Sequence, residues 1–416
     1  MRLAADESVA QFRAGFEAWL DEHLPQADAI EADPRRSSSH LPGWARTFQR
    51  EMYEAGYLVP GWPPELGGCN ATAEEQMAYF EVIAERMAPR SLNPQGINIC
   101  AASIVEFGTD AQKERFVAPT LKGEITWCVG MSEPNAGSDL ASLTTRAERD
   151  GDHWVVNGQK VWTSYAHIAR WGILLARTDA AATKHSGIGY FVCPMDAPGI
   201  EIRPLIDMTG EHAFNEVFLS DVRIPADHLV GPEHAGWELA KVTLGNERVS
   251  LSGEGALWGM GPTAEDLVGL VRDAGGAPDP FTRRRLVDVY VEAQILRVLR
   301  LRMVSAVLAG RAPGPEASVR KAIADAHGQH IMDLGRDLAG PHAMLAGTGP
   351  VGGWGRSHPS RATPADPSAS PASPPPVDPT WSRGFLFAPA LTVGGGTAEV
   401  QRNIVAEKVL GLPRDP

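Results

Sequence analysis

The chain has 416 residues, of which 43% are hydrophobic and 21% are charged, and its formal net charge is −13. This length and composition are ordinary for a globular protein of two or three domains with a substantial core. The negative charge argues against nucleic acid as a partner, no apolar run approaches the ~20 residues that cross a bilayer, and the N-terminus lacks the features of a secretory signal.

The first part of the chain, residues 1–125, has a helical pattern. Phe12, Phe16 and Leu20 recur at helical spacing, and a turn-rich stretch rich in Pro and Gly at 60–68 then interrupts the pattern. Further helices are expected at 73–85 and 112–121.

The middle part, residues 126–235, consists of short apolar runs separated by Gly, Asp and Pro, which predicts a β-domain. The clearest runs are at 154–156, 171–176 and 189–192. Asn157-Gly158, between Val156 and Val161, predicts a two-residue hairpin turn.

The last part, residues 236–416, returns to long helices, expected at 236–259, 281–310, 316–340 and 397–411. Six apolar residues at helical spacing should face the core of a helical bundle: Leu286, Val289, Tyr290, Ala293, Leu296 and Leu299. Residues 357–379 are mostly Pro, Ser and Ala, which predicts a mobile surface loop. The order is therefore α, then β, then α.

The four cysteines, Cys69, Cys100, Cys128 and Cys193, are far apart and lack the spacing of metal ligands. We interpret them as reduced thiols of a cytoplasmic protein.

The segment from Ser132 to Ser138 combines Pro, Gly and Ser in one loop. Small residues of this kind expose successive backbone N–H groups and hydroxyls, which suit an anionic pyrophosphate or an electron-rich ring edge. The alternative, from the residues alone, is an ordinary Gly/Pro turn.

Six motifs follow one another along the chain, at 107–113, 131–139, 158–164, 214–218, 222–225 and 393–403. Together, in this order and spacing, they resemble the acyl-CoA dehydrogenase family over almost the whole chain. The resemblance implies an α+β fold with an N-terminal helical domain (1–125), a middle β-barrel-like domain (126–235) and a C-terminal four-helix bundle (236–416). The pattern is closest to bacterial dehydrogenases of steroid side chains.

The same resemblance implies an FAD site. Met131, Ser132 and Ser138 would line the cofactor, Trp162 would pack near the isoalloxazine ring, and Ser164 would approach its N5 edge.

Further FAD contacts implied by the resemblance lie near the C-terminus. Arg283 would reach the pyrophosphate of a neighbouring subunit, although the Phe-Gly that usually follows is missing. Asp337 and Gly340 stand in the segment that replaces the family's Gln-x-x-Gly-Gly adenosine contact, and Thr397 belongs to the C-terminal signature.

Dehydrogenation beside a thioester needs a carboxylate to take the α-proton. Gly395 stands where many family members carry that glutamate. The branch that includes isovaleryl-CoA dehydrogenase places the base at the Glu of a Glu-Arg pair, here Glu247-Arg248, although such pairs are usually solvent-exposed. Glu254 is the fallback, and Glu399 matches a position that is not catalytic in the family.

Gly395 keeps a backbone N–H that, by the resemblance, would hold the thioester oxygen, a contact worth ~3 kcal/mol in related oxyanion sites. The missing side chain leaves room for a bulky, branched or ring-bearing acyl group. Ser138, Leu244 and Arg248 would contact the substrate.

The resemblance thus implies FAD-dependent oxidation of an acyl-CoA thioester to the 2-enoyl-CoA, in fatty acid or steroid side-chain β-oxidation. An electron-transferring flavoprotein would accept the electrons, and the assembly would be a homotetramer or a heterotetramer with a related subunit. Three alternatives stay open: a non-catalytic or half-site subunit, a flavin oxidase or monooxygenase on the same scaffold, and an acyl-carrier-protein thioester in place of acyl-CoA.

Overall fold

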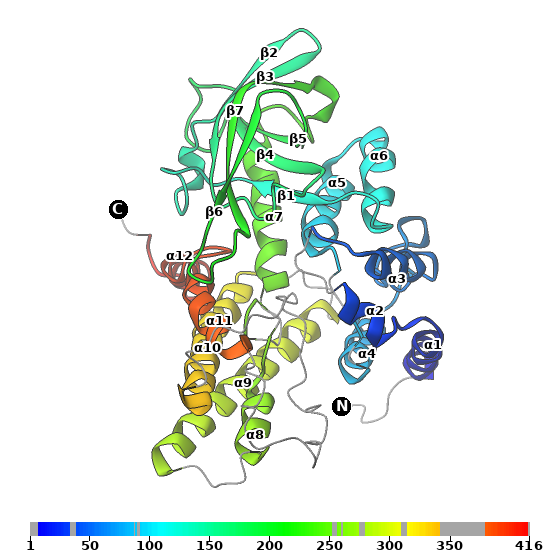
Figure 1. Cartoon of the computed structure of the whole chain (residues 1–416). Helices are drawn as coiled ribbons and strands as arrows, with labels where there is room; N and C mark the ends of the chain where they lie inside the picture. Colours follow the sequence, from blue (N-terminus) through cyan, green and yellow to red (C-terminus); the bar gives the residue numbers. More distant parts are fainter. Residues whose placement is uncertain are drawn as a thin grey trace. The chain divides into compact units, whose positions relative to one another are not determined.

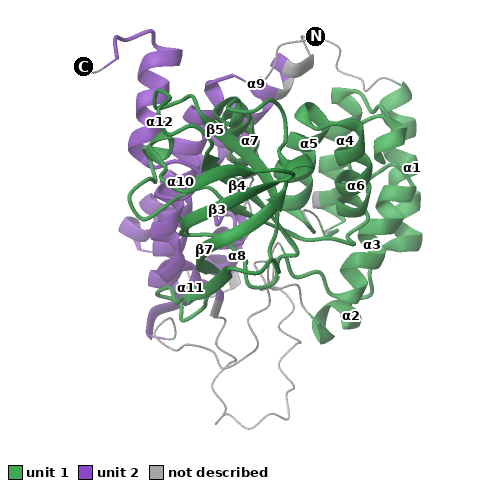
Figure 2. Cartoon of the chain, turned by 90° about the horizontal axis from the view of Figure 1, so that it is seen from above, with its two compact units in different colours: residues 1–247 green, residues 248–416 purple. Residues whose placement is uncertain are grey.

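The computed structural model describes residues 7–33, 39–86, 88–89, 92–251, 256–258, 261–273, 279–308, 314–341 and 379–414. The chain divides into two compact units, Met1–Glu247 and Arg248–Pro416 (Figure 2). The first unit contains N-terminal helices and a β-sheet, and the second is helical (Figure 1).

The N-terminal helices follow the predicted apolar spacing. Phe16 and Leu20 on one face of α1 are fully buried, and aromatic rings from Trp19, Phe48 and Tyr79 complete this small core. The α-helices are α1 (Glu7–His23), α2 (Ala27–Ala32), α3 (Gly43–Glu54), α4 (Ala73–Glu85), α5 (Ala102–Phe107) and α6 (Asp110–Leu121). A π-helix, Gln95–Ala101, leads directly into α5.

The sheet has seven strands in the order β1-β4-β2-β3-β7-β6, with β5 paired to β4. β1 and β2 run parallel to β4, and the other pairs are antiparallel. The strands are β1 (Trp127–Gly130), β2 (Arg146–Asp150), β3 (His153–Lys160), β4 (Trp171–Arg177), β5 (Ile188–Pro194), β6 (Ile200–Leu205) and β7 (Phe214–Pro225).

The hairpin predicted at Asn157-Gly158 is wrong. β3 runs straight through these residues, and its pairing with β7 shifts register between Val156 and Gly158, as at a β-bulge. Glycine is needed because a Cβ at position 158 would lie 2.4 Å from Thr145 Oγ1. The turn that does connect β2 to β3 contains Gly151, whose φ is 60°.

The remaining helices are α7 (Gly236–Leu251), α8 (Ala264–Asp273), α9 (Pro280–Leu308), α10 (Glu316–Ala339), α11 (Pro379–Phe387) and α12 (Ala398–Ile404). Val289 and Leu296 on α9 are buried as predicted, but Tyr290 is 44% exposed, so its predicted core position is wrong. The buried residues lie seven positions apart on one narrow seam, and Tyr290 falls outside it. Apart from Pro379, the predicted loop 357–379 lies outside the described residues.

All four cysteines are free thiols, as predicted. Cys100, Cys128 and Cys193 are buried, and burial raises the pKa of the Cys193 thiol to about 12. Within the described ranges, no helix has both the length and the apolar character of a membrane span.

Candidate functional site

The loop that follows β1 is tied to the end of β3 by two hydrogen bonds. Lys160 Nζ donates to the Met131 carbonyl (3.1 Å), and the Val161 N–H donates to the Ser132 carbonyl (2.9 Å). Met131 packs into the core, whereas Ser138, farther along the loop, is exposed. The sequence alone could not show that these two segments, about thirty residues apart, are in contact.

A buried ion pair, Glu133–Lys160, lies beneath this loop, with 2.8 Å between carboxylate and ammonium. Glu133 also accepts hydrogen bonds from the Thr144 N–H and hydroxyl and from the Thr145 N–H. Burial raises the pKa of Glu133, but Lys160 and these donors outweigh it and hold the pKa at about 2. Burial also lowers the pKa of Lys160, to about 8, although Glu133 opposes this shift. Both groups are therefore charged at neutral pH.

The segment after β3 has a strained backbone. Trp162 (φ 60°) and Tyr165 (φ 55°) adopt the left-handed conformation, which bulky residues rarely occupy. Asn215 on β7 holds this segment from both sides: its carbonyl accepts from the Thr163 N–H, and its Nδ2 donates to the Thr163 carbonyl, both at 3.0 Å. Ser164 lies between the two strained residues, so its position is fixed by its surroundings.

Two serines at these segments have unused donors. Among the described residues, neither the N–H nor the hydroxyl of Ser132 or Ser164 has a hydrogen-bond partner, and neither residue is fully buried. Beside Ser164, the Trp162 indole is 62% exposed and meets Phe214 edge-on, with 6.0 Å between ring centres. Unpaired donors beside an exposed aromatic face fit the heteroatom edge of a planar ring such as isoalloxazine.

α7 is anchored to the sheet by Thr243, whose hydroxyl is within hydrogen-bond distance of Ser103 Oγ (3.1 Å) and of Tyr190 OH (2.9 Å). Leu244 packs against the same core, and Glu247, one turn beyond Thr243, is half-buried. The side chain of Arg248 and all of Glu254 lie outside the described part of the structure.

The C-terminal signature forms a tight turn before α12. Gly395 (φ 68°) and Gly396 (φ 94°) adopt the left-handed conformation, and Thr397 begins α12 by accepting a hydrogen bond from the Val400 N–H. Gln401 is fully buried, and its Nε2 donates to the carbonyls of Gly395 (3.3 Å) and Gly396 (3.2 Å). The N–H of Gly395 has no partner within the resolved ranges of the second unit.

Comparison with known proteins identifies the family. Three family models match this chain: the N-terminal domain of acyl-CoA dehydrogenase at residues 6–124, the middle domain at 128–222, and the C-terminal domain at 234–410.

The chain belongs to the acyl-CoA dehydrogenase family.

Among its relatives, acyl-CoA dehydrogenase IpdE1 from Mycobacterium tuberculosis is 36% identical over 98% of this chain and 99% of its own length. Acyl-CoA dehydrogenase FadE34 from the same organism is 38% identical over 88% of this chain and 46% of its own. Two solved structures align with this chain over its full length and over their own full length. The Tcur3481-Tcur3483 steroid ACAD has a TM-score of 0.77 at 28% identity, and the ChsE4-ChsE5 complex from Mycobacterium tuberculosis has a TM-score of 0.74 at 30% identity.

These findings confirm the predicted family and the predicted α+β fold. The protein is an acyl-CoA dehydrogenase, an oxidoreductase of a family that generally depends on FAD. The residues of the first unit fit that cofactor, because they combine free donors, an exposed indole and a backbone held in a strained conformation.

Among the predicted FAD contacts of the second unit, Asp337 differs from the serines of the first unit because its side chain has hydrogen-bond partners within the chain. Asp337 is already paired with Arg285 (2.6 Å) and Arg336 (2.8 Å), and these hydrogen bonds lower the pKa of its carboxyl. Arg283 is exposed, and Gly340 (φ 58°) follows the last turn of α10. The Asp337 carboxylate is therefore neutralised by arginines of its own chain.

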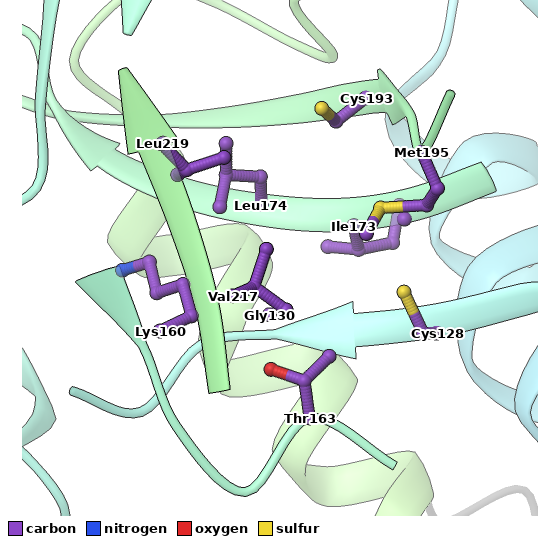
Figure 3. A pocket seen from close by; sticks show the side chains of 11 residues that line it. Cys128, Gly130, Lys160, Thr163, Ile173, Leu174, Cys193, Met195, Val217 and Leu219 are labelled. Carbon is purple, nitrogen blue, oxygen red and sulfur yellow. The ribbon is translucent and has the colours of Figure 1, made fainter. Parts of the chain in front are cut away.

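A small cavity lies inside the middle domain, with no more space than a water molecule needs. In Figure 3 the sulfur atoms of Cys128, Met195 and Cys193 lie on one side of it and the Lys160 side chain on the other. Thr163 also lines the cavity, and its buried hydroxyl lacks a hydrogen-bond partner in the described structure. The cavity is too small for a coenzyme.

Three polar residues that hold these segments, each within its own unit, were not assigned a role from the sequence: Lys160, Asn215 and Gln401. A signal for the first two was present. Lys160 occupies a position on β3 in phase with buried Trp154, and Asn215 occupies one on β7 in phase with buried Val217. A polar side chain at a core position of a strand must find a buried partner.

Proposed function

We propose that the chain oxidises an acyl-CoA thioester to the 2-enoyl-CoA with FAD as cofactor. The observation that carries the proposal is the pair of constrained segments at 131–133 and 162–165, which leave the donors of Ser132 and Ser164 unpaired. When bound, FAD would accept the β-hydride. Met131, Ser132 and Ser138 would line FAD, Trp162 would pack near its isoalloxazine ring, and Ser164 would approach the N5 edge of the ring.

Glu247 is the proposed base for the α-proton. It sits on α7, which the hydroxyl of Thr243 anchors to the sheet, and it is half-buried, so its carboxylate is partly shielded from water. Arg248 and Leu244 would contact the substrate.

Gly395 is the proposed oxyanion donor. Its N–H makes no hydrogen bond to any described residue, and Gln401 binds the carbonyls of Gly395 and Gly396. Arg283, Asp337, Gly340 and Thr397 are the proposed FAD contacts of the same unit, and Arg283 would reach the pyrophosphate of a neighbouring subunit.

The proposed substrate carries a bulky, branched or ring-bearing acyl group. A glycine at position 395 leaves space where a glutamate side chain would otherwise stand. The solved relative with a TM-score of 0.77 is named a steroid ACAD, which supports a ring-bearing substrate for this chain. In a variant of this proposal, the acyl group is carried as a thioester on a carrier protein and not on coenzyme A.

The proposed assembly contains a second subunit, either another copy or a related chain. One stripe along α9 is apolar and half-exposed: Val287, Val291, Ile295 and Val298 are each between 45% and 56% exposed. The solved relatives named after two proteins support a heteromeric assembly. An electron-transferring flavoprotein is the proposed electron acceptor, and the proposed domains are 1–125, 126–235 and 236–416.

The test is anaerobic mixing of the purified chain with a bulky, ring-bearing acyl-CoA and with butyryl-CoA, followed by flavin absorbance. Bleaching by the bulky thioester, lost in Glu247→Gln and kept in Glu399→Gln, is the expected result; Glu399 is 75% exposed and serves as the matched control. Faster bleaching by butyryl-CoA would refute the substrate proposal. Bound flavin that neither thioester reduces would refute the reaction.

A second candidate function is that of a half-site subunit. It is favoured by Asp337, whose carboxylate is already paired within the chain. A colourless chain that acquires FAD only on mixing with a related subunit would establish it.

A further inference from the structure

The two constrained segments of the first unit share one arrangement. In each, a buried side chain on a strand of the sheet donates to the carbonyl of the residue before a serine: Lys160 on β3 to Met131, and Asn215 on β7 to Thr163. In a trans peptide the carbonyl and the following N–H point in opposite directions. Lys160 and Asn215 therefore direct the N–H groups of Ser132 and Ser164 away from the core.

Packing alone does not require these polar side chains. Lys160 and Asn215 are both 0% exposed and occupy strand positions whose neighbours in phase are apolar. Burying the Asn215 amide costs free energy that an apolar side chain of similar size would not, and burying the Glu133–Lys160 ion pair costs free energy that an apolar pair would not. The Thr163 N–H already pairs with the Asn215 backbone carbonyl, so the Asn215 side chain adds a constraint to a segment that is already attached.

The second constrained segment, residues 162–165, also has a strained backbone. Left-handed φ values at non-glycine residues cost about 1–3 kcal/mol each and persist only where the surroundings impose them. Trp162 and Tyr165 both have such values, on either side of Ser164. The Tyr165 N–H donates to the Ala213 carbonyl (2.7 Å), so β7 and the residues before it hold the strained segment at two points.

We propose that Lys160 and Asn215 are positioning residues for the flavin, which fix the N–H groups of Ser132 and Ser164 in the direction of the ring's heteroatom edge. This inference rests on the proposed function in taking FAD as the ligand. Donors aimed at a flavin edge stabilise the electron-rich reduced form more than the oxidised form. Lys160 and Asn215 should therefore raise the reduction potential of the bound flavin without touching it.

The experiment compares Asn215→Leu and Lys160→Met with Gln49→Met. Gln49 is the matched control, because it is also 0% exposed and its Nε2 donates to two backbone carbonyls, Thr120 and Leu121, in the N-terminal helical part. FAD affinity, the visible spectrum and the reduction potential are measured with dithionite and a reference dye, in the absence of thioester.

We expect each of the two variants to lower the equilibrium constant for flavin reduction about tenfold, which is about 30 mV for a two-electron couple. The flavin absorption bands should shift with it, and Gln49→Met should match the wild type in both. Wild-type potential, spectrum and affinity in both variants would overturn the inference.

Asn215→Ser, which leaves room for a water molecule, replaces Asn215→Leu if the latter does not fold. If Asn215→Leu, Asn215→Ser and Lys160→Met all fail to fold, Asn215 and Lys160 have a structural role, and the inference is overturned as well. A wild-type chain that binds FAD but is not reduced by any thioester would refute the proposed function alone, since dithionite still reports the potential.

Discussion

Replacing Glu133 by glutamine would leave one unpaired charge, the Lys160 ammonium, buried beneath the loop after β1. The new amide would keep the shape of the side chain, but the Lys160 ammonium would lose its counter-charge and retain the Met131 carbonyl. Removing one member of a buried ion pair costs about 3–5 kcal/mol, because an uncompensated charge stays in the core. The pKa of Glu133 gives a similar size: the difference between 4.5 and about 2 corresponds to about 3 kcal/mol at ~1.4 kcal/mol per pKa unit. We expect a loss of about 3 kcal/mol in the free energy of unfolding at pH 7.

The double variant Glu133→Gln/Lys160→Met should be more stable than Glu133→Gln alone, because no charge then remains in the core. The pH dependence has a defined sign. The pKa of Glu133 is lower in the folded chain than its ordinary value of 4.5, so its contribution is complete above pH 4.5 and is lost as the pH falls toward 2. The difference between wild type and Glu133→Gln should shrink over that window.

The assay is urea denaturation of the purified chain at fixed FAD concentration, followed by tryptophan fluorescence at pH 7 and again at pH 4 and pH 3. Glu148→Gln is the control: its carboxylate is 70% exposed in the same sheet, so its loss should change stability by less than about 0.5 kcal/mol. The reasoning is refuted if Glu133→Gln is as stable as this control at pH 7. It is also refuted if the double variant is less stable than the single one.

Three further predictions concern other parts of the chain. Gly158→Ala should lower the free energy of unfolding by about 1–3 kcal/mol, since its Cβ would lie 2.4 Å from Thr145 Oγ1; thermal denaturation measures this, and an unchanged midpoint would contradict the bulge geometry. Gln401→Leu should slow anaerobic flavin bleaching by a bulky acyl-CoA about tenfold or more, because the turn that presents the Gly395 N–H loses its side-chain support; bleaching at the wild-type rate would contradict this role. Ile295→Glu should weaken subunit association on α9, seen as a smaller species in sedimentation, whereas an unchanged sedimentation coefficient would exclude this stripe as the contact.

Much of the architecture was accessible from the sequence because it depends on local patterns. The spacing of Phe16 and Leu20 predicted a helix with one buried face, and the apolar run at 171–176 predicted a strand, which is now β4. The ordered motifs predicted the family, which the comparisons confirm. These features depend on a few neighbouring residues, and hydrophobic burial selects the same face wherever the pattern occurs.

The tertiary structure decided features that depend on distant partners. Asn157-Gly158 has the local preference of a hairpin turn, but pairing of β3 with strands on both sides and the close approach of Thr145 make it a bulge. Tyr290 fits the helical period but misses the narrow seam that α9 buries.

The same holds for the site. The sequence contains Lys160 and Asn215, and their strand phase indicates burial, yet their partners lie 29 and 52 residues away in the chain. No local preference specifies which carbonyl a buried ammonium or amide will bind. Only the folded sheet brings the two donors to the carbonyls of Met131 and Thr163. The tertiary packing of the strands, and not the propensity of any single residue, sets these donor–acceptor distances.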